Sequence, residues 1–248
     1  MNELSLFTGA GGGVLGTTML GFKHIGYVEW NEHCQRVIAQ RIKDGLISNA
    51  PIYGDIRTFN SEGYAESYKG LVDVVSAGFP CQPFSGSGHQ LGEEDPRNMW
   101  PATISTIRTI RPKIAWLENV PTLLANKYIR RIFADLAKLG MSVRWGVLGT
   151  GETGGICTGK RLWILAFTPN SSIIKSMDLQ NIFTYSKESL GRQYSGAVSS
   201  MLSKDDYTEL KRDSNAVAIG MERLKAIGNG QDPILAATAF RILSGIGE

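Results

Sequence analysis

One cysteine of this chain stands where a reactive thiol would be useful. Cys81 lies between Pro80 and Pro83, and an apolar run over 71–76, typical of a buried parallel strand, precedes it. Because each proline fixes its own φ and biases the residue before it away from helix, the thiol is expected in a stiff turn at a strand end. A buried structural cysteine is the plainer alternative. The glycines and polar residues that follow suit a reaction loop better, so we predict a nucleophile.

A carboxylate ends a second apolar run. The strand predicted over Lys113–Leu117 is followed directly by Glu118, Asn119 and Val120. A carboxylate at a strand end is more often a capping or solvated group. A Glu that follows Ile-Ala-Trp-Leu, however, starts partly buried, where its pKa rises and it can hold a proton. We therefore predict that Glu118 is an acid.

The chain opens with elements that are typical of nucleotide binding. The pattern predicts a strand over Glu3–Phe7, a glycine-rich turn over Thr8–Gly13 and a helix over Val14–Leu20. The next strand, Ile25–Val28, ends in Glu29, and an acidic residue at this position typically binds the ribose hydroxyls of an adenosine. A plain tight turn is the alternative for the glycines alone. Together with Glu29 they predict an adenosine-type cofactor.

The remaining periodic segments place these groups on an α/β fold. Strands and helices alternate, as in a Rossmann-like parallel sheet, and the last two strands are expected to form an antiparallel pair. The segments are a helix over Asn31–Lys43, a strand over Pro51–Tyr53, a helix ending near Ile110, a helix over Lys127–Gly140, strands over Ser142–Leu148 and Leu162–Phe167, and a helix over Pro233–Leu243.

Composition narrows the class of protein. The 248 residues are 42% hydrophobic and 20% charged, as in an ordinary soluble α/β protein, and the net charge of +3 permits a polyanionic partner without requiring one. Three cysteines without a Cys-x-x-Cys pair argue against a zinc site and a disulfide framework. No run of ~18 apolar residues and no basic leader occurs. We expect a cytoplasmic protein without metal or membrane span.

Four motifs, in this order along the chain, resemble those of the cytosine C5 DNA methyltransferase family. They are Leu6-Phe-Thr-Gly-Ala-Gly-Gly12, Gly78-Phe-Pro-Cys-Gln-Pro-Phe-Ser85, Glu118-Asn-Val120 and Ala226-Ile-Gly-Asn-Gly230. The resemblance implies a Rossmann-like methyltransferase that uses S-adenosyl-L-methionine (AdoMet) and acts on double-stranded DNA. One mild departure is Ser5, where family members often carry Asp.

The resemblance also implies which residues bind AdoMet. Asp55 would recognise the adenine amino group and Ile56 would pack on the ring, although an Asp that caps a turn explains Asp55 equally well from local sequence. The implied cofactor-binding set is Phe7, Thr8, Gly9, Gly11, Glu29, Trp30, Asp55, Ile56, Pro80 and Asn229.

The family mechanism would use three side chains of this chain. Cys81 would add to C6 of a flipped cytosine, Glu118 would donate to or protonate N3, and Arg161 would orient the base or Glu118. In the family a Gln-x-Arg-x-Arg pattern precedes the last strand. Here Cys157 and Gly159 replace the glutamine and the first arginine, so only Arg161 of the pattern remains.

Domain organisation follows from the same motifs. Residues 1–167, completed by 226–248, are expected to form the catalytic domain, and 168–225 a short target-recognition region. That region carries eight basic and seven acidic residues, so its charge does not single it out as a DNA-binding surface, and a surface insertion is the alternative.

Three other functions are compatible with parts of the sequence. Methylation of a cytosine in RNA, such as transfer RNA, would use the same chemistry. An inactive nucleic-acid-binding relative is possible because the arginine motif is altered. An NAD-dependent oxidoreductase would share the opening strand, turn and helix, but it would explain neither Cys81 nor Glu118.

Overall fold

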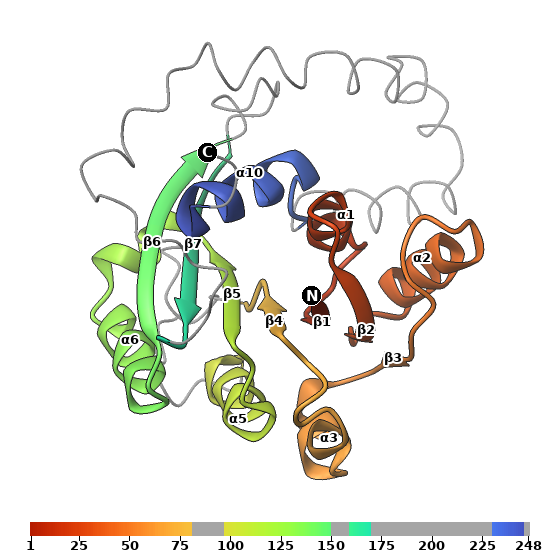
Figure 1. The fold of residues 1–248 in the computed structure, drawn as a ribbon, viewed down its shortest axis with the longest axis horizontal. Helices are drawn as coiled ribbons and strands as arrows, with labels where there is room; N and C mark the ends of the chain where they lie inside the picture. Colours follow the sequence, from red (N-terminus) through yellow and green to blue (C-terminus); the bar gives the residue numbers. More distant parts are fainter. Residues whose placement is uncertain (81–96, 150–158, 170–229, 246–248) are drawn as a thin grey trace.

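A computed structural model describes residues 1–80, 97–149, 159–169 and 230–245. Within these residues a seven-stranded sheet has the order β3-β2-β1-β4-β5-β7-β6 (Figure 1). The strands are β1 (Asn2–Leu6), β2 (Lys23–Val28), β3 (Ile52–Tyr53), β4 (Val74–Ala77), β5 (Ile114–Asn119), β6 (Ser142–Gly149) and β7 (Lys160–Phe167).

The first five strands are parallel, and β7 runs antiparallel to both of its neighbours. This confirms the Rossmann-like sheet and the antiparallel pair predicted at its end. The carboxyl ends of the parallel strands meet at one edge, where open α/β sheets bind their ligands. Because β6 and β7 run in opposite directions, Gly149 at the end of β6 and Lys160 at the start of β7 lie at the same edge.

Helices cover both faces of the sheet, with α1, α2 and α10 on one side and α3, α5 and α6 on the other (Figure 1). The described helices are α1 (Gly12–Met19), α2 (Glu32–Lys43), α3 (Ile56–Ser61), α4 (Tyr64–Ser67), α5 (Trp100–Ile110), the 3-10 helix η3 (Pro121–Ala125), α6 (Tyr128–Lys138) and α10 (Pro233–Ser244). No described helix is long and apolar enough to cross a bilayer.

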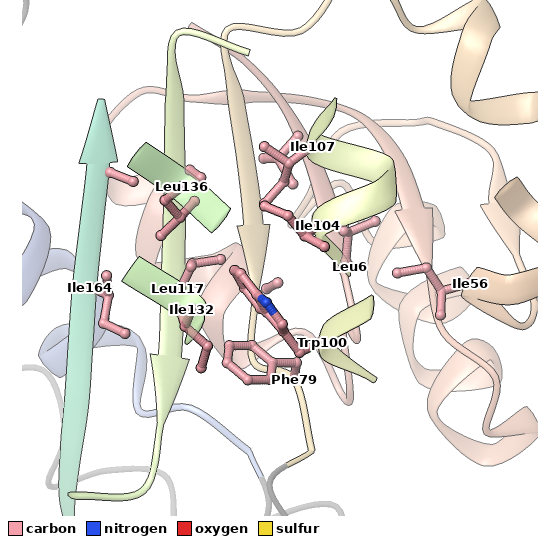
Figure 2. Close-up of a cluster of buried hydrophobic side chains, with 14 of the residues drawn as sticks. Leu6, Ile56, Phe79, Trp100, Ile104, Ile107, Leu117, Ile132, Leu136 and Ile164 are labelled. Carbon is pink, nitrogen blue, oxygen red and sulfur yellow. The ribbon is translucent and has the colours of Figure 1, made fainter. Parts of the chain in front are cut away.

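The larger core lies between the sheet and α3, α5 and α6. Alternate residues of β1, β4 and β5 face these helices, and Ile104 and Ile107 of α5 pack over them (Figure 2). Trp100, at the start of α5, lies against Phe79 with ring centroids 5.3 Å apart. This contact anchors the end of β4, the strand that leads into Cys81.

On the opposite face α10 packs against α1. A Cβ atom added to Gly16 of α1 would lie 2.5 Å from the carbonyl oxygen of Pro233, so only glycine permits this approach. The apolar face of α10 also covers β5 and β7, where Phe240 contacts Trp116 edge to face. The end of the described chain therefore returns beside its beginning.

A buried pair of ionisable side chains, Glu3 and His24, lies beneath α1. Nε2 of His24 lies 3.1 Å from a carboxylate oxygen of Glu3, and both side chains are fully buried. Ser76 donates to the other Glu3 oxygen, and the Thr17 hydroxyl lies 2.9 Å from His24 Nε2. The pair and its hydrogen bonds connect β1, β2, β4 and α1.

Three short helices, α3, α4 and η3, have no counterpart in the sequence prediction. Each has four to six residues, too few for a hydrophobic period to repeat. Their buried residues, such as Phe59 and Leu123, join the larger core. Tertiary packing therefore explains these helices better than local propensity does.

Candidate active site

The glycine-rich turn after β1 has an unusual backbone. Phe7, Gly9 and Gly11 all have positive φ, at 52°, 58° and 84°. Such a φ is uncommon for a residue with a bulky side chain like Phe7, and residues of this kind cluster at ligand sites. The Thr8 hydroxyl donates to the Ser5 carbonyl over 3.1 Å and holds the turn against the strand.

Glu29 joins this turn to the start of α2. One carboxylate oxygen accepts a hydrogen bond from the Gly9 amide at 2.6 Å, and the other accepts from the Asn31 amide at 2.8 Å. The residue is buried, with 7% of its surface exposed. Each carboxylate oxygen can accept a further hydrogen bond, so the group remains able to bind a hydroxyl.

A cavity of about 290 Å³ opens at the carboxyl ends of the central strands. This volume is close to the lower end of the range for small-molecule sites, roughly 300–1,000 Å³. Trp30 is 75% exposed at its wall. The cavity is lined by Phe7, Val28, Trp30, Gly54, Asp55, Ile56, Arg57, Pro80, Arg97 and Met99. Apolar and aromatic walls with a few polar groups suit an adenine ring.

Asp55 serves as the cap of a helix. Its side chain accepts from the Arg57 amide at the start of α3 and forms an ion pair with the Arg57 guanidinium. The hydrogen bond from the Arg57 side chain is the main cause that holds the pKa of Asp55 below its ordinary value. The capping alternative is thus present in the structure, while Asp55 and Ile56 also line the cavity.

Glu118 is a buried acid near the carboxyl end of β5. Only 9% of its surface is exposed. Burial raises the pKa of Glu118 to about 7, against the lowering effects of Arg161 and of a hydrogen bond from Gln231. A carboxyl group with this pKa exchanges protons readily near neutral pH. Glu118 and Asn119 lie inside β5, which ends two residues beyond Leu117, the predicted end of the strand.

Arg161 lies beside Glu118 on the neighbouring strand β7. Its Nε atom is 3.0 Å from Oε1 of Glu118. Because Glu118 pairs with Trp163 across the antiparallel strands, Arg161 is on the same face of the sheet as Glu118. Gly159 precedes the strand, and a Cβ atom added to it would lie 3.3 Å from Nη1 of Arg161, which is a tight contact.

The end of β4 is fixed by β5. Asn119 donates its side-chain amide to the Phe79 carbonyl over 3.0 Å in a buried hydrogen bond. Pro80 is exposed and lines the cavity. Cys81 and Asn229 of the closing motif lie outside the described residues. Of the other predicted site residues, Glu118 lies against Arg161, and Phe7, Trp30, Asp55, Ile56 and Pro80 line one cavity.

Gln231 is a site residue that the sequence prediction missed. Its side chain hydrogen-bonds to Glu118, although the two are far apart in the chain. Gln231 and Glu118 line a narrow cavity of about 30 Å³ together with Thr8, Gly9 and Gly78. Its position directly after the motif Asn229-Gly230 was the one available signal.

Solved structures share this fold. A mutant of DNMT2 from Spodoptera frugiperda matches with a TM-score of 0.58 at 18% identity, covering 71% of this chain and 53% of that one. Dnmt2 of S. pombe matches with a TM-score of 0.55 at 16% identity, covering 75% and 55%. At these identities the likeness establishes the fold, an α/β methyltransferase sheet.

Curated relatives are named type II methyltransferases. The chain is 36% identical over 156 residues to M.NgoMIV of Neisseria gonorrhoeae. These residues cover 61% of this chain and 47% of the relative. It is 33% identical over 168 residues to M.HaeII of Haemophilus aegyptius, covering 66% and 49%. The chain spans about half the length of the curated relatives it matches.

A sequence model of C-5 cytosine-specific DNA methylases matches residues 1–231, which is most of the chain. The match includes both the glycine-rich turn and the strand that carries Glu118. This chain belongs to the C-5 cytosine-specific DNA methylase family.

Proposed function

We propose that this chain is a DNA (cytosine-5-)-methyltransferase that transfers a methyl group from AdoMet to C5 of a flipped cytosine. The observation that carries the proposal is the arrangement of Glu118 and the end of β4. A buried acid with a pKa of about 7 lies next to Gly78, three residues before Cys81. The proposed proton donor would then lie beside the segment that leads to Cys81, the one cysteine of the sequence that stands between two nearby prolines.

The described residues fit the cofactor that the family implies. Trp30 and Ile56 would pack on the adenine, and Asp55 would accept from its amino group. Glu29 would bind the ribose hydroxyls, and the turn Phe7–Gly11 would border the remainder of the molecule. When bound, AdoMet supplies the electrophilic methyl group. Pro80 would complete the wall, and Asn229 is proposed to lie near the same site.

Cys81 would act on the base. Its thiolate would form a bond to C6 of cytosine, which makes C5 enamine-like and able to attack the methyl group. After methylation a water molecule would take the C5 proton, the electrons of the C5–H bond would re-form the C5–C6 double bond as the bond from sulfur to C6 breaks, Cys81 would leave as the thiolate, and N3 would return its proton to Glu118. The Asn119–Phe79 hydrogen bond would hold the strand end that carries this loop.

Glu118 would provide the proton that this addition requires. As sulfur adds to C6, negative charge builds up on the ring. The Glu118 carboxyl would donate its proton to N3 and so neutralise that charge. Arg161, 3.0 Å from the carboxylate, would keep it oriented toward the base. With glycine at position 159, Arg161 would perform this task without a neighbouring arginine.

Double-stranded DNA is the proposed partner, with 168–225 as the target-recognition region and the remainder as the catalytic domain. The names of the curated relatives favour a modification role of the kind that accompanies restriction enzymes. Most of this region lies outside the described residues, so its function is proposed from the order of the motifs.

Transfer of tritiated methyl groups tests the proposed function. The purified chain is incubated with labelled AdoMet and duplex DNA, transfer RNA or no nucleic acid. We expect label in the C5 position of cytosine in DNA alone. Label in transfer RNA alone would assign the RNA alternative, and binding of DNA without label in either would indicate an inactive relative.

A further inference from the structure

The Glu118 carboxylate has a different neighbour at each oxygen. Oε1 faces Arg161 of β7 at 3.0 Å. On the other side, a Cβ atom added to Gly78, which directly follows β4, would lie 3.0 Å from Oε2 of Glu118 and 2.9 Å from Nε2 of Gln231. Oε2 and the Gln231 amide nitrogen therefore border the same small space, which only a glycine leaves open.

The Gln231 amide has a defined orientation. Its oxygen lies toward the first turn of α1, since a Cβ atom at Gly13 would meet Gln231 Oε1 at 2.1 Å. Its nitrogen lies toward Glu118, to which it hydrogen-bonds. The N-terminus of a helix favours a carbonyl oxygen and a carboxylate favours an N–H donor, so both ends of the amide have a suitable partner.

We propose that Gln231 is a positioning residue for Glu118: its amide, held against the first turn of α1, donates to the Glu118 carboxylate and fixes its orientation. The inference rests on the proposed function, because it assigns Gln231 to the same acid. Gln231 would thus connect the glycine-rich turn, where the cofactor is proposed to bind, to the group that donates the proton.

The surroundings of Glu118 explain why the neutral Gln231 donor should affect its pKa. Of the described segments packed around it, β7 contributes the charged Arg161, the residues directly after β4 contribute Gly78, and the segment before α10 contributes Gln231. Burial raises the pKa of Glu118, while Arg161 and Gln231 lower it. Without the Gln231 donor, Arg161 alone lowers the pKa of Glu118 against the effect of burial. The pKa of Glu118 should therefore rise.

Two substitutions separate the donor from the shape of the side chain. Gln231→Leu removes the amide. Gln231→Glu keeps nearly the same shape but replaces the donor by a second acid, and two neighbouring carboxyl groups raise the pKa of one of them. Asp232→Ala is the matched control, since Asp232 caps α10 through the Leu235 amide and is adjacent to Gln231.

The pKa of Glu118 is measured by NMR in protein with ¹³C-labelled carboxyl groups, and its signal is assigned with Glu118→Gln. We expect both Gln231 variants to titrate higher than wild type by about one pH unit, with Gln231→Glu shifted most. Asp232→Ala should leave the titration unchanged. The alkaline limb of kcat/KM for methyl transfer should move upward by the same interval in the Gln231 variants.

The two readouts distinguish the possible failures. If wild type transfers no methyl group but the titration moves as expected, the positioning role stands and the proposed function is wrong. If Gln231→Leu and Gln231→Glu both titrate as wild type does, Gln231 does not position Glu118 and the inference is overturned. A shift of equal size in Asp232→Ala would also overturn it, because it would assign the effect to general loosening of α10.

Discussion

Glu118 combines two properties that oppose one another. Burial disfavours its charged form, whereas Arg161 and Gln231 favour it, and burial is the largest of these effects. The result is a pKa of about 7, where the acid can both hold and release its proton. The side chain is therefore suited to proton donation but unfavourable for the folded state at high pH.

This opposition predicts a dependence of stability on pH. Because the pKa of Glu118 rises from 4.5 to about 7 on folding, the folded state binds this proton more tightly than the unfolded chain. The stabilising contribution is complete below the unfolded pKa and is lost as pH rises through about 7. Relative to Glu118→Gln, wild type should lose about 2–3 kcal/mol between pH 5 and pH 8. Urea unfolding of both proteins at both pH values measures this, and a constant difference between them would contradict it.

Glu29 offers a second test at the scale of one residue. Glu29→Gln should raise the Kd for AdoMet about tenfold, because it weakens a charge-assisted hydrogen bond to the ribose. Calorimetry gives the Kd directly. Glu32→Gln is the control, since Glu32 is an exposed carboxylate on α2 with an ion pair to Arg36. Equal Kd values in the two variants would mean that the cofactor binds elsewhere.

At the scale of elements, the pair Glu3–His24 holds β1 and β2 to α1. Removal of one partner of a buried pair typically costs about 3–5 kcal/mol, because the other is left without compensation. We expect Glu3→Leu to destabilise by about this amount, and the double change Glu3→Leu with His24→Leu to destabilise by less. Urea unfolding of the single and double variants measures the coupling. If the double variant lost as much stability as the sum of the two single variants, Glu3 and His24 would have no coupling energy.

Elements with a clear period could be predicted from the sequence. The apolar runs of β4 and β5 and the glycine-rich turn before α1 gave the parallel sheet and its ligand-binding edge. Glu118 was predicted to be partly buried because four apolar residues precede it, and the structure buries it almost fully. Arg161 was assigned to the second arginine of the family pattern by counting back from the predicted last strand. In the structure β7 brings Arg161 next to Glu118. Its role in the reaction stays a prediction.

Contacts between distant segments could not be predicted in this way. Gln231 reaches Glu118 because α10 packs tightly against α1, and that packing depends on glycines whose neighbours the sequence does not reveal. The hydrogen bond from Asn119 to Phe79 likewise depends on the register of β4 and β5. The helix α3 was missed, although Asp55 was considered as a turn cap.

At the level of the whole molecule, the described residues on either side of the proposed target-recognition region lie at opposite ends of the parallel strands. β7 ends at Phe167, which pairs with Ile114 at the start of β5. Gln231, where the chain returns, lies beside Glu118 near the end of β5. The described chain therefore returns directly to the site, next to the proposed cofactor turn.

The size of 168–225 predicts a short recognition sequence. A single DNA-reading module buries about 600–1,000 Å² of protein surface, and each base pair that is read requires one or two side chains. We expect a target of about two to four base pairs. Bisulfite sequencing of plasmid methylated by the protein reads the target directly. A strict site of six or more base pairs, from a protein shown to be a monomer, would refute this expectation.

We propose above that Cys81 bonds to the target cytosine while Glu118 acts as the acid. Duplex DNA that contains 5-fluorocytosine tests it, because fluorine cannot leave as the C5 proton does and the adduct persists. With AdoMet present, mass spectrometry should show one protein joined to one DNA strand and one methyl group, with the link at Cys81. Cys81→Ala should form no adduct while it still binds AdoMet. A stable adduct in Cys81→Ala, or methylation of ordinary DNA by that variant at the wild-type rate, would contradict the account.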